Sequence, residues 1–263
     1  MGLSFLLISQ IKIKPSMENI LRPVWKKVFN FNWKFGLFLI LVVCLPRFAL
    51  VLDANATKNY GYIGLVMVVS ALAPFIFLTR KGLKEIGITK PKNYRWLLIG
   101  FFIGLIISLL LFYLGDYIYG DTFNNWYNYI GRSYNIPPDI GKEDKVAMFL
   151  IMAVTGMVFS PIGEELFFRG IVHSSFAKSI GDRKASLVDS LAFALTHISH
   201  FGLVFVGGGW NFLLLPTIIW VLGMFMASIF FFASKFYSGS ILGAILCHSG
   251  FNLGMIYCIF YML

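Results

Sequence analysis

Long apolar runs, separated by short polar and basic segments, dominate this chain of 263 residues. An apolar helix needs about 20 residues to cross roughly 30 Å of hydrocarbon. Seven runs approach that length, and they cover approximately residues 35–52, 61–79, 96–115, 146–163, 185–201, 212–233 and 240–260. The pattern predicts an all-α fold, a polytopic membrane helix bundle of about seven transmembrane spans within a range of six to eight.

Polar residues interrupt two of these runs. Pro46 and Arg47 break the first run, which predicts a kinked or shortened span. The fifth run carries Asp189, His197 and His200 and is too polar to face lipid. We therefore expect the fifth span to face the interior of the bundle.

Composition agrees with a membrane protein, because 58% of the residues are hydrophobic and 13% are charged, against about 25% charged in soluble proteins. The mean hydropathy is +0.78. We expect a multi-pass protein of the cell membrane that contacts membrane lipids. The net charge of +10 is explained by membrane topology and by attraction to anionic headgroups, and no nucleic-acid partner is expected.

The basic residues predict the orientation of the chain. Seventeen of the 22 Lys and Arg residues lie in segments 1–34, 80–95, 164–184 and 234–239, and four lie in the alternate loops. Short basic loops stay cytoplasmic, so the N-terminus is predicted inside and the C-terminus outside. Glu164 then lies near the cytoplasmic end of the fourth span, which predicts a site in the cytoplasmic half of the membrane.

Several smaller features carry weaker expectations. Met17 is an alternative start to Met1. The predicted outer loop 116–145 is expected to lie on the surface, with Trp126 at headgroup depth. A glycine run at 207–209 forms the other outer turn. The three cysteines lie in apolar spans without a pairing pattern and are expected to be core residues: Cys44, Cys247 and Cys258.

The sequence Glu164-Glu165-x-x-x-Arg169 places charges at the end of an apolar run. A charge at the centre of a bilayer costs about 2.5–3.5 kcal/mol on insertion scales, so buried charges there usually pair or have a function. Glu165 and Arg169 are four residues apart, a spacing at which opposite charges meet on one helix face. Glu164 then points about 100° away. An ion-pair network at the helix end is the alternative interpretation.

Two further motifs lie on later spans, Phe193-x-x-x-His197 and His248-x-x-x-Asn252. In each motif the spacing stacks two side chains on one helix face. A single buried histidine is more often structural, and we expect that role for His173, which has no patterned partner. Buried polar groups on three spans, however, are costly unless they satisfy one another or serve a site. The motifs therefore predict one common cavity.

The motifs EExxxR, FxxxH and HxxxN, in this order on successive spans, resemble the CPBP family of intramembrane proteases. This family includes CAAX prenyl proteases and bacteriocin-processing enzymes and is also called the Abi family. The resemblance covers about residues 146–256. It divides the chain into a basic cytoplasmic N-terminal segment (1–34), variable N-terminal spans (35–145) and a protease core (146–260).

The resemblance implies an intramembrane endopeptidase that cuts membrane-associated or lipid-modified peptides or proteins. Glu164 and His197 would activate water, while His248 and Asn252 would stabilise the oxyanion. The supporting residues would be Glu165, Arg169 and Phe193. No cofactor is expected. A Glu, two His and an Asn are a set that could bind zinc, but no His-Glu-x-x-His motif is present and Asn is a poor zinc ligand.

Other functions remain open at this stage. One is a non-catalytic membrane binding protein for bacteriocin self-immunity, and another is a zinc-dependent version of the same protease. A transporter is disfavoured because no inverted repeat is evident. The sequence does not decide between prenylated proteins, bacteriocins and signalling peptides as substrates, and it does not predict the oligomeric state.

Overall fold

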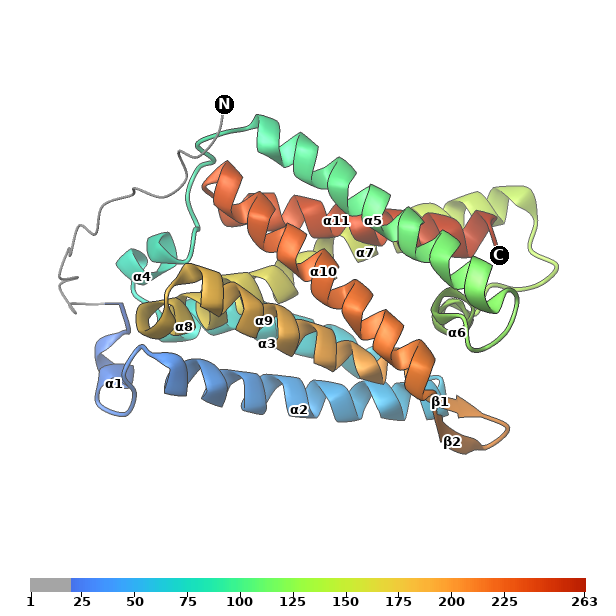
Figure 1. The fold of residues 1–263 in the computed structure, drawn as a ribbon, viewed down its shortest axis with the longest axis horizontal. Helices are drawn as coiled ribbons and strands as arrows, with labels where there is room; N and C mark the ends of the chain where they lie inside the picture. The colour runs from blue at the N-terminus through green and yellow to red at the C-terminus, as the bar shows by residue number, and fades with distance from the viewer. Residues whose placement is uncertain (1–19) are drawn as a thin grey trace, which may run out of the picture.

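A computed structural model describes residues 20–263, which fold into a bundle of helices with one small hairpin (Figure 1). Met1, Met17 and most of the predicted basic segment 1–34 lie outside the described residues. The elements in chain order are α1 (Pro23–Lys26), α2 (Trp33–Thr57), α3 (Gly61–Phe77), α4 (Arg80–Glu85), α5 (Arg95–Tyr119), α6 (Trp126–Gly131), η1 (Arg132–Tyr134), α7 (Lys142–Glu165), η2 (Leu166–Val172), α8 (His173–Ile180), α9 (Asp182–Thr196), η3 (His197–Ser199), β1 (Leu203–Val206), β2 (Gly209–Phe212), α10 (Leu214–Ser238) and α11 (Ile241–Tyr261).

All seven apolar runs are helical, which confirms the all-α polytopic prediction. Among residues 20–263, five helical segments are long and apolar enough to cross a membrane: α2, α5, the continuous segment Lys142–Ile180, α10 and α11. The other two predicted spans are shorter. Helix α3 has 17 residues and α9 has 15.

Helix α2 is a single helix of 25 residues that continues through Pro46. The first span is therefore not shortened, and the kink at Pro46 stays a prediction. The Asn32 side chain begins the helix by accepting hydrogen bonds from the backbone N–H groups of Lys34 and Phe35. Arg47 lies on the buried side of this helix and is only 4% exposed. A buried cation in an apolar span needs a partner.

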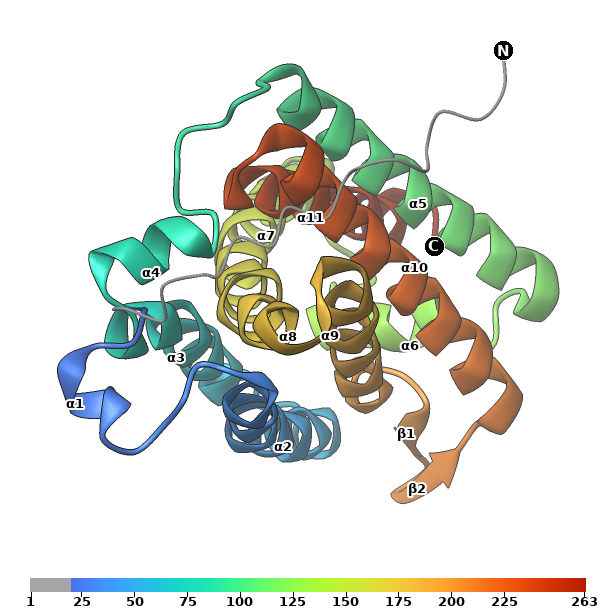
Figure 2. The ribbon, with the colours of Figure 1, turned by 60° about the vertical axis from the view of Figure 1, so that its left-hand side comes forward.

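Helices α8 and α9 lie between α2 and α3 on one side and α10 on the other (Figures 1 and 2). Helix α9 buries the polar face that carries Asp189 and Ser190, as expected from the fifth run. Its opposite face is apolar and exposed, with Leu187 and Leu191 about half accessible. One face of the fifth predicted span therefore points into the bundle, as expected, and the other face is part of the exposed apolar surface of the protein.

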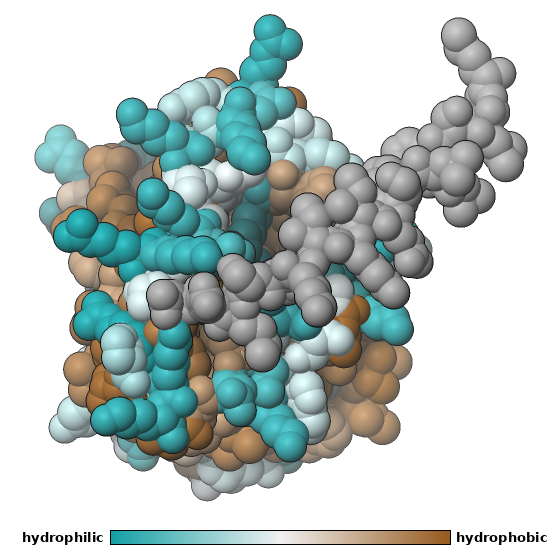
Figure 3. All heavy atoms as spheres, turned by 90° about the vertical axis from the view of Figure 1, so that its left-hand side faces the viewer, coloured by the Kyte–Doolittle hydropathy of each residue, from teal (hydrophilic) through white to brown (hydrophobic). Residues whose placement is uncertain are grey.

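Hydrophilic side chains cover the end of the bundle that carries α1 and α4 (Figure 3). Exposed Lys and Arg residues there include Lys27, Arg80, Lys81 and Lys84. The opposite end carries the hairpin, in which β1 and β2 are antiparallel and Leu203 pairs with Phe212. Gly207 and Gly208 form the turn with φ values of 62° and 80°, which glycine adopts without strain.

Close packing fixes α11 against α5. A Cβ at Gly104 would lie 1.8 Å from the carbonyl oxygen of Cys247, and a Cβ at Gly250 would lie 2.0 Å from that of Phe101. Small residues let two membrane helices approach to backbone contact. Because these contacts surround His248, they set the position of that side chain.

The segment between α5 and α7 differs from the surface loop that its sequence predicts. Trp126 is fully buried, stacks on Trp220 with 6.1 Å between ring centroids, and donates a hydrogen bond to the carbonyl of Leu111. The expected headgroup position of Trp126 is therefore wrong. An amphipathic Trp suits a membrane interface and a core with a hydrogen-bond acceptor equally well.

Candidate active site

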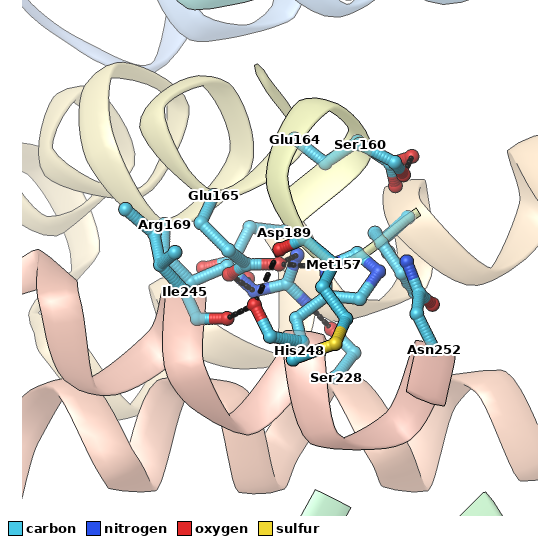
Figure 4. Close-up of polar contacts among 12 residues, drawn as sticks. Met157, Ser160, Glu164, Glu165, Arg169, Asp189, Ser228, Ile245, His248 and Asn252 are labelled. Carbon is cyan, nitrogen blue, oxygen red and sulfur yellow. Dashed lines mark hydrogen bonds and ion pairs between the residues drawn. The ribbon is translucent and has the colours of Figure 1, made fainter. Parts of the chain in front are cut away.

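The two adjacent glutamates point to different partners (Figure 4). Glu164 Oε1 accepts hydrogen bonds from Arg47 Nη2 at 2.9 Å and from Ser160 Oγ at 2.7 Å. Glu165 Oε1 accepts from Arg169 Nη1 at 3.2 Å and from His248 Nδ1 at 2.8 Å. Both glutamates are at most 2% exposed, so their charges must be balanced within the protein.

Arg169 lies in η2, a π-helical segment of seven residues that continues directly from α7. Such segments are rare and often occur at functional sites. The predicted pair with Glu165 is confirmed, since Arg169 Nε lies 3.2 Å from Glu165 Oε2. Arg169 also hydrogen-bonds Ser228 and lies 3.8 Å from Asp189 Oδ1. This guanidinium therefore joins η2 to α9 and α10.

Phe193 packs between the two histidines of the later motifs. Its ring centroid is 4.4 Å from that of His197 and 5.7 Å from that of His248. The Arg169 guanidinium lies 4.4 Å from the same ring, within the range of a cation–π interaction. The first residue of the FxxxH motif thus contacts residues of all three motifs.

A backbone hydrogen bond fixes the ring of His197. Nδ1 lies 2.8 Å from the carbonyl oxygen of Phe193. A carbonyl can only accept, so Nδ1 carries the proton and donates it, and Nε2 of the neutral ring is an acceptor. His197 can therefore take a proton at Nε2 without losing this bond.

His248 is fixed in a similar way from the other side. Its Nδ1 donates to the Glu165 carboxylate, and its ring stacks on Phe231 with 4.6 Å between centroids. A neutral His248 would then carry no proton at Nε2, whereas an imidazolium would donate from Nε2 as well. Donation from Nε2 therefore requires a proton on both ring nitrogens.

Asn252 lies one turn beyond His248 on α11. Its Nδ2 donates to the carbonyl of Gly156 at 2.8 Å, and the neighbouring Ser249 hydroxyl donates to the carbonyl of Met157 at 2.6 Å. These two bonds tie α11 to α7. One N–H of the Asn252 amide is used in this way, and the second remains available to another acceptor.

The predicted site residues converge on the middle of the bundle. Phe193 contacts the rings of His197 and His248, and Glu165, which adjoins Glu164, accepts a hydrogen bond from His248. Within residues 20–263, Glu164 Oε2 is buried and has no hydrogen-bond partner. Glu164 thus has one oxygen that accepts hydrogen bonds and one that accepts none from the described residues.

The helical segment that carries Glu164 is longer than the apolar run 146–163. It continues from Glu165 to Ile180, so Glu164 lies inside the segment and not at its end. His197 directly follows α9, and Asn55 near the hairpin end of α2 donates to the adjacent Ser199 carbonyl at 2.8 Å. His197 thus lies towards the hairpin end of the bundle, and the predicted place of the site in the cytoplasmic half of the membrane stays a prediction.

The sequence interpretation missed Arg47, which it treated only as an interruption of the first span. A useful signal was present, because a lone charge in one apolar span and an unpaired glutamate in another predict a buried pair.

The sequence interpretation also missed the partners of His173. His173 Nδ1 lies 2.6 Å from Asp189 Oδ2, and His173 Nε2 lies 3.2 Å from Asp182 Oδ1. Charged groups thus continue from His248 to the exposed Asp182.

The donor set fits a zinc ion poorly. Within residues 20–263, no group of three or more His, Cys, Asp or Glu residues has an arrangement that could hold a metal. The Arg47 guanidinium already contacts Glu164 Oε1 at 2.9 Å, and its positive charge would repel a cation bound there. Asn252 contributes an amide, which zinc rarely uses.

Comparison with known proteins agrees with the motif assignment. Residues 146–254 match the family model described as type II CAAX prenyl endopeptidase Rce1-like. No curated protein and no solved structure matches the chain. The matched segment extends from α7 into α11 and contains all three motifs, whereas Arg47 lies outside it. The chain therefore contains an Rce1-like domain of the CPBP family, whose members are CAAX-type intramembrane proteases, within a helical membrane protein.

Proposed function

We propose that the protein is an intramembrane endopeptidase in which Glu164 and His197 activate the hydrolytic water. One observation carries this proposal: Glu164 Oε2 is a buried acceptor without a partner among the described residues. The second acceptor is His197 Nε2, since Nδ1 is committed to the Phe193 carbonyl. A water molecule has two protons, and it can donate one to each acceptor.

Both proton acceptors take part in the reaction. A water held in this way directs a lone pair at the carbonyl carbon of the scissile bond. As the new C–O bond forms, Glu164 takes one proton as the general base, and His197 keeps the water oriented. Glu164 then returns that proton to the leaving amine as the C–N bond breaks. One water is consumed, and one carboxylate and one amine are formed.

His248 and Asn252 would stabilise the negative charge that develops on the carbonyl oxygen. His248 donates from Nε2 as an imidazolium whose charge is balanced by Glu165, and Asn252 donates its second amide N–H. A donor of this kind lowers the barrier by about 2.7–4 kcal/mol. The buried position of both residues strengthens these interactions, because water does not compete for them.

The substrate is a membrane-borne peptide or protein, and a prenylated C-terminal peptide is the first choice. The family match supports a prenylated substrate. The outer surface of α7 is apolar and exposed at Ile151, Val154 and Phe159. A lipid-modified peptide can diffuse along such a surface within the bilayer. Bacteriocin and signalling peptides remain alternative substrates.

The test compares wild type with Glu164→Gln in proteoliposomes, with a farnesylated CAAX peptide that carries a fluorophore and a quencher. Glu143→Gln is the matched control, because Glu143 lies on the same helix, α7, but is exposed. Cleavage by wild type and Glu143→Gln, together with its loss in Glu164→Gln, supports the proposal. Cleavage that persists in Glu164→Gln contradicts the role of Glu164.

Loss of the Glu164 charge leaves Arg47 buried without a counter-charge, so Glu164→Gln could also unfold the protein. The double variant Arg47→Met/Glu164→Gln removes both charges and controls for this effect. It should melt at a higher temperature than Glu164→Gln and should remain inactive. Activity in the folded double variant would contradict the glutamate mechanism.

One observation favours the second candidate, a binding protein without catalysis. Both glutamates are held in buried ion pairs, which is also what a structural scaffold requires. This function predicts that peptide binding or host immunity survives in Glu164→Gln at an unchanged level. The protease predicts that immunity based on cleavage is lost.

A further inference from the structure

We propose that Arg47 is a positioning residue of the active site: it fixes Oε1 of Glu164, so that Oε2 is the oxygen that takes the proton from water. The inference rests on the proposed function. It adds a residue from α2, outside the segment 146–254 that matches the family model.

Two donors converge on one oxygen of Glu164. Arg47 Nη2 reaches Oε1 at 2.9 Å and Ser160 Oγ reaches it at 2.7 Å. Oε2 receives no hydrogen bond within residues 20–263. The carboxylate plane is therefore held from one side, and the oxygen on the other side is free to bind water.

The neighbouring glutamate differs, because the Arg169 guanidinium lies near both of its oxygens. Glu165 Oε1 binds Arg169 and His248, and Glu165 Oε2 lies 3.2 Å from Arg169 Nε. Glu165 Oε2, like Glu164 Oε2, receives no hydrogen bond within residues 20–263, but it lies against the Arg169 guanidinium. Of the two adjacent glutamates, only Glu164 has an oxygen without a charged or hydrogen-bonded partner among the described residues.

The fold holds α2 on both sides of Arg47. Towards the basic end, Gly36 packs so closely on α8 that a Cβ there would lie 2.3 Å from Ser175 Oγ. Towards the hairpin end, the Asn55 amide donates to the Ser199 carbonyl in η3 at 2.8 Å. Both contacts connect α2 with elements that adjoin the motif residues. The part of α2 that carries Arg47 is thus held in place, and this fixes the position from which the side chain contacts Glu164.

The chemistry of arginine suits this role. Its guanidinium is planar, always charged and directional, so it restricts the rotation of a carboxylate. Lysine would keep the charge but would carry it on a freely rotating ammonium group. Because Arg47 acts on Glu164 and not on the substrate, its removal should lower kcat and change KM little. A displacement of about 1 Å at a reacting group can cost about 100-fold in rate.

The experiment measures kcat, KM and the thermal midpoint of wild type, Arg47→Met, Arg47→Lys and Arg22→Met with the farnesylated CAAX peptide in proteoliposomes. Arg22→Met is the matched control, since Arg22 also hydrogen-bonds through its guanidinium, to the Leu78 carbonyl at 3.0 Å, but lies in the chain that leads into α1. We expect kcat to fall about 100-fold in Arg47→Met with KM within a few-fold of wild type. Arg47→Lys should recover part of kcat, and Arg22→Met should keep it.

Two results overturn the inference while the proposed function stands. One is a wild-type kcat in Arg47→Met with only a lower thermal midpoint, which assigns Arg47 a structural role. The other is a raised KM with unchanged kcat, which assigns it to substrate binding. If Arg47→Met does not fold, Arg47→Lys decides alone: a reduced kcat supports the inference, and a wild-type kcat overturns it.

Failure of the proposed function gives a different result. If wild type leaves the farnesylated peptide intact, the same variants are compared on the peptide bond whose cleavage in cell membranes is lost in Glu164→Gln. If no such bond exists, the endopeptidase function is wrong, and this inference is overturned with it.

Discussion

His248 on α11 donates a hydrogen bond from Nδ1 to Oε1 of Glu165, 83 positions earlier in the chain, at 2.8 Å. This contact divides the roles of the two adjacent glutamates. Glu165 holds Arg169 and His248, and Glu164 keeps one oxygen without a partner among the described residues. The EExxxR motif thus combines a structural carboxylate with one that is available for chemistry.

The first prediction concerns Glu165. Glu165→Gln should destabilise the protein by about 3–5 kcal/mol, because Arg169 remains buried after losing its closest counter-charge. It should also lower kcat, because His248 loses the carboxylate that accepts from Nδ1 and fixes its ring. Thermal unfolding in detergent and kinetics on the farnesylated peptide measure the two effects. A variant with wild-type stability would contradict the buried ion pair.

The second prediction separates the catalytic and structural roles of Asn252. Asn252→Ala should lower kcat by about 100- to 1,000-fold if its amide stabilises the oxyanion. Ser249→Ala is the matched control, because Ser249 makes the equivalent tie from α11 to the Met157 carbonyl. It should cost about 0.5–1.5 kcal/mol of stability and leave kcat near wild type. Equal kcat losses in both variants would assign Asn252 a structural role.

The third prediction uses the close approach of α5 and α11. In Gly104→Ala the new methyl carbon would lie 1.8 Å from the Cys247 carbonyl oxygen. The two helices must therefore move apart, and this displaces His248. Both stability and kcat should fall. Gly64→Ala, on α3, meets nothing within 4 Å and should be neutral or slightly stabilising. An unaffected Gly104→Ala variant would refute this packing.

The fourth prediction concerns metals. Cleavage should survive exhaustive dialysis against EDTA and 1,10-phenanthroline, because the Arg47 guanidinium contacts Glu164 Oε1 at 2.9 Å and its charge would repel a cation at this carboxylate. Added zinc should not stimulate the dialysed protein. Activity that is lost on chelation and restored by zinc would favour the zinc-dependent alternative. Metal content by mass spectrometry of the purified protein provides an independent measurement.

Local sequence patterns predicted some features well. Apolar runs near 20 residues predicted the helices, and the four-residue spacing predicted the pair of Glu165 and Arg169, because both depend on residues close together in the chain. The pair of Arg47 and Glu164 spans 117 positions. Its geometry depends on how α2 packs against α7 and η2, which no local pattern contains.

The prediction for Trp126 was wrong because tryptophan suits two environments. Trp126 was expected at the membrane interface, but its indole N–H finds the Leu111 carbonyl inside the core. His173 was expected to be structural, and its contacts with Asp189 and Asp182 agree with that role, although the sequence did not predict these partners. The catalytic roles of the motif residues rest on the proposed function and are open to experiment.

The most direct measurement compares peptides from the membrane and medium of cells that express wild type, Glu164→Gln or Glu143→Gln at equal levels, by mass spectrometry. The account predicts at least one cleavage product that is present with wild type and Glu143→Gln and absent with Glu164→Gln. This product would also identify the substrate. Identical peptide profiles from all three, with every variant folded in the membrane, would contradict the endopeptidase function.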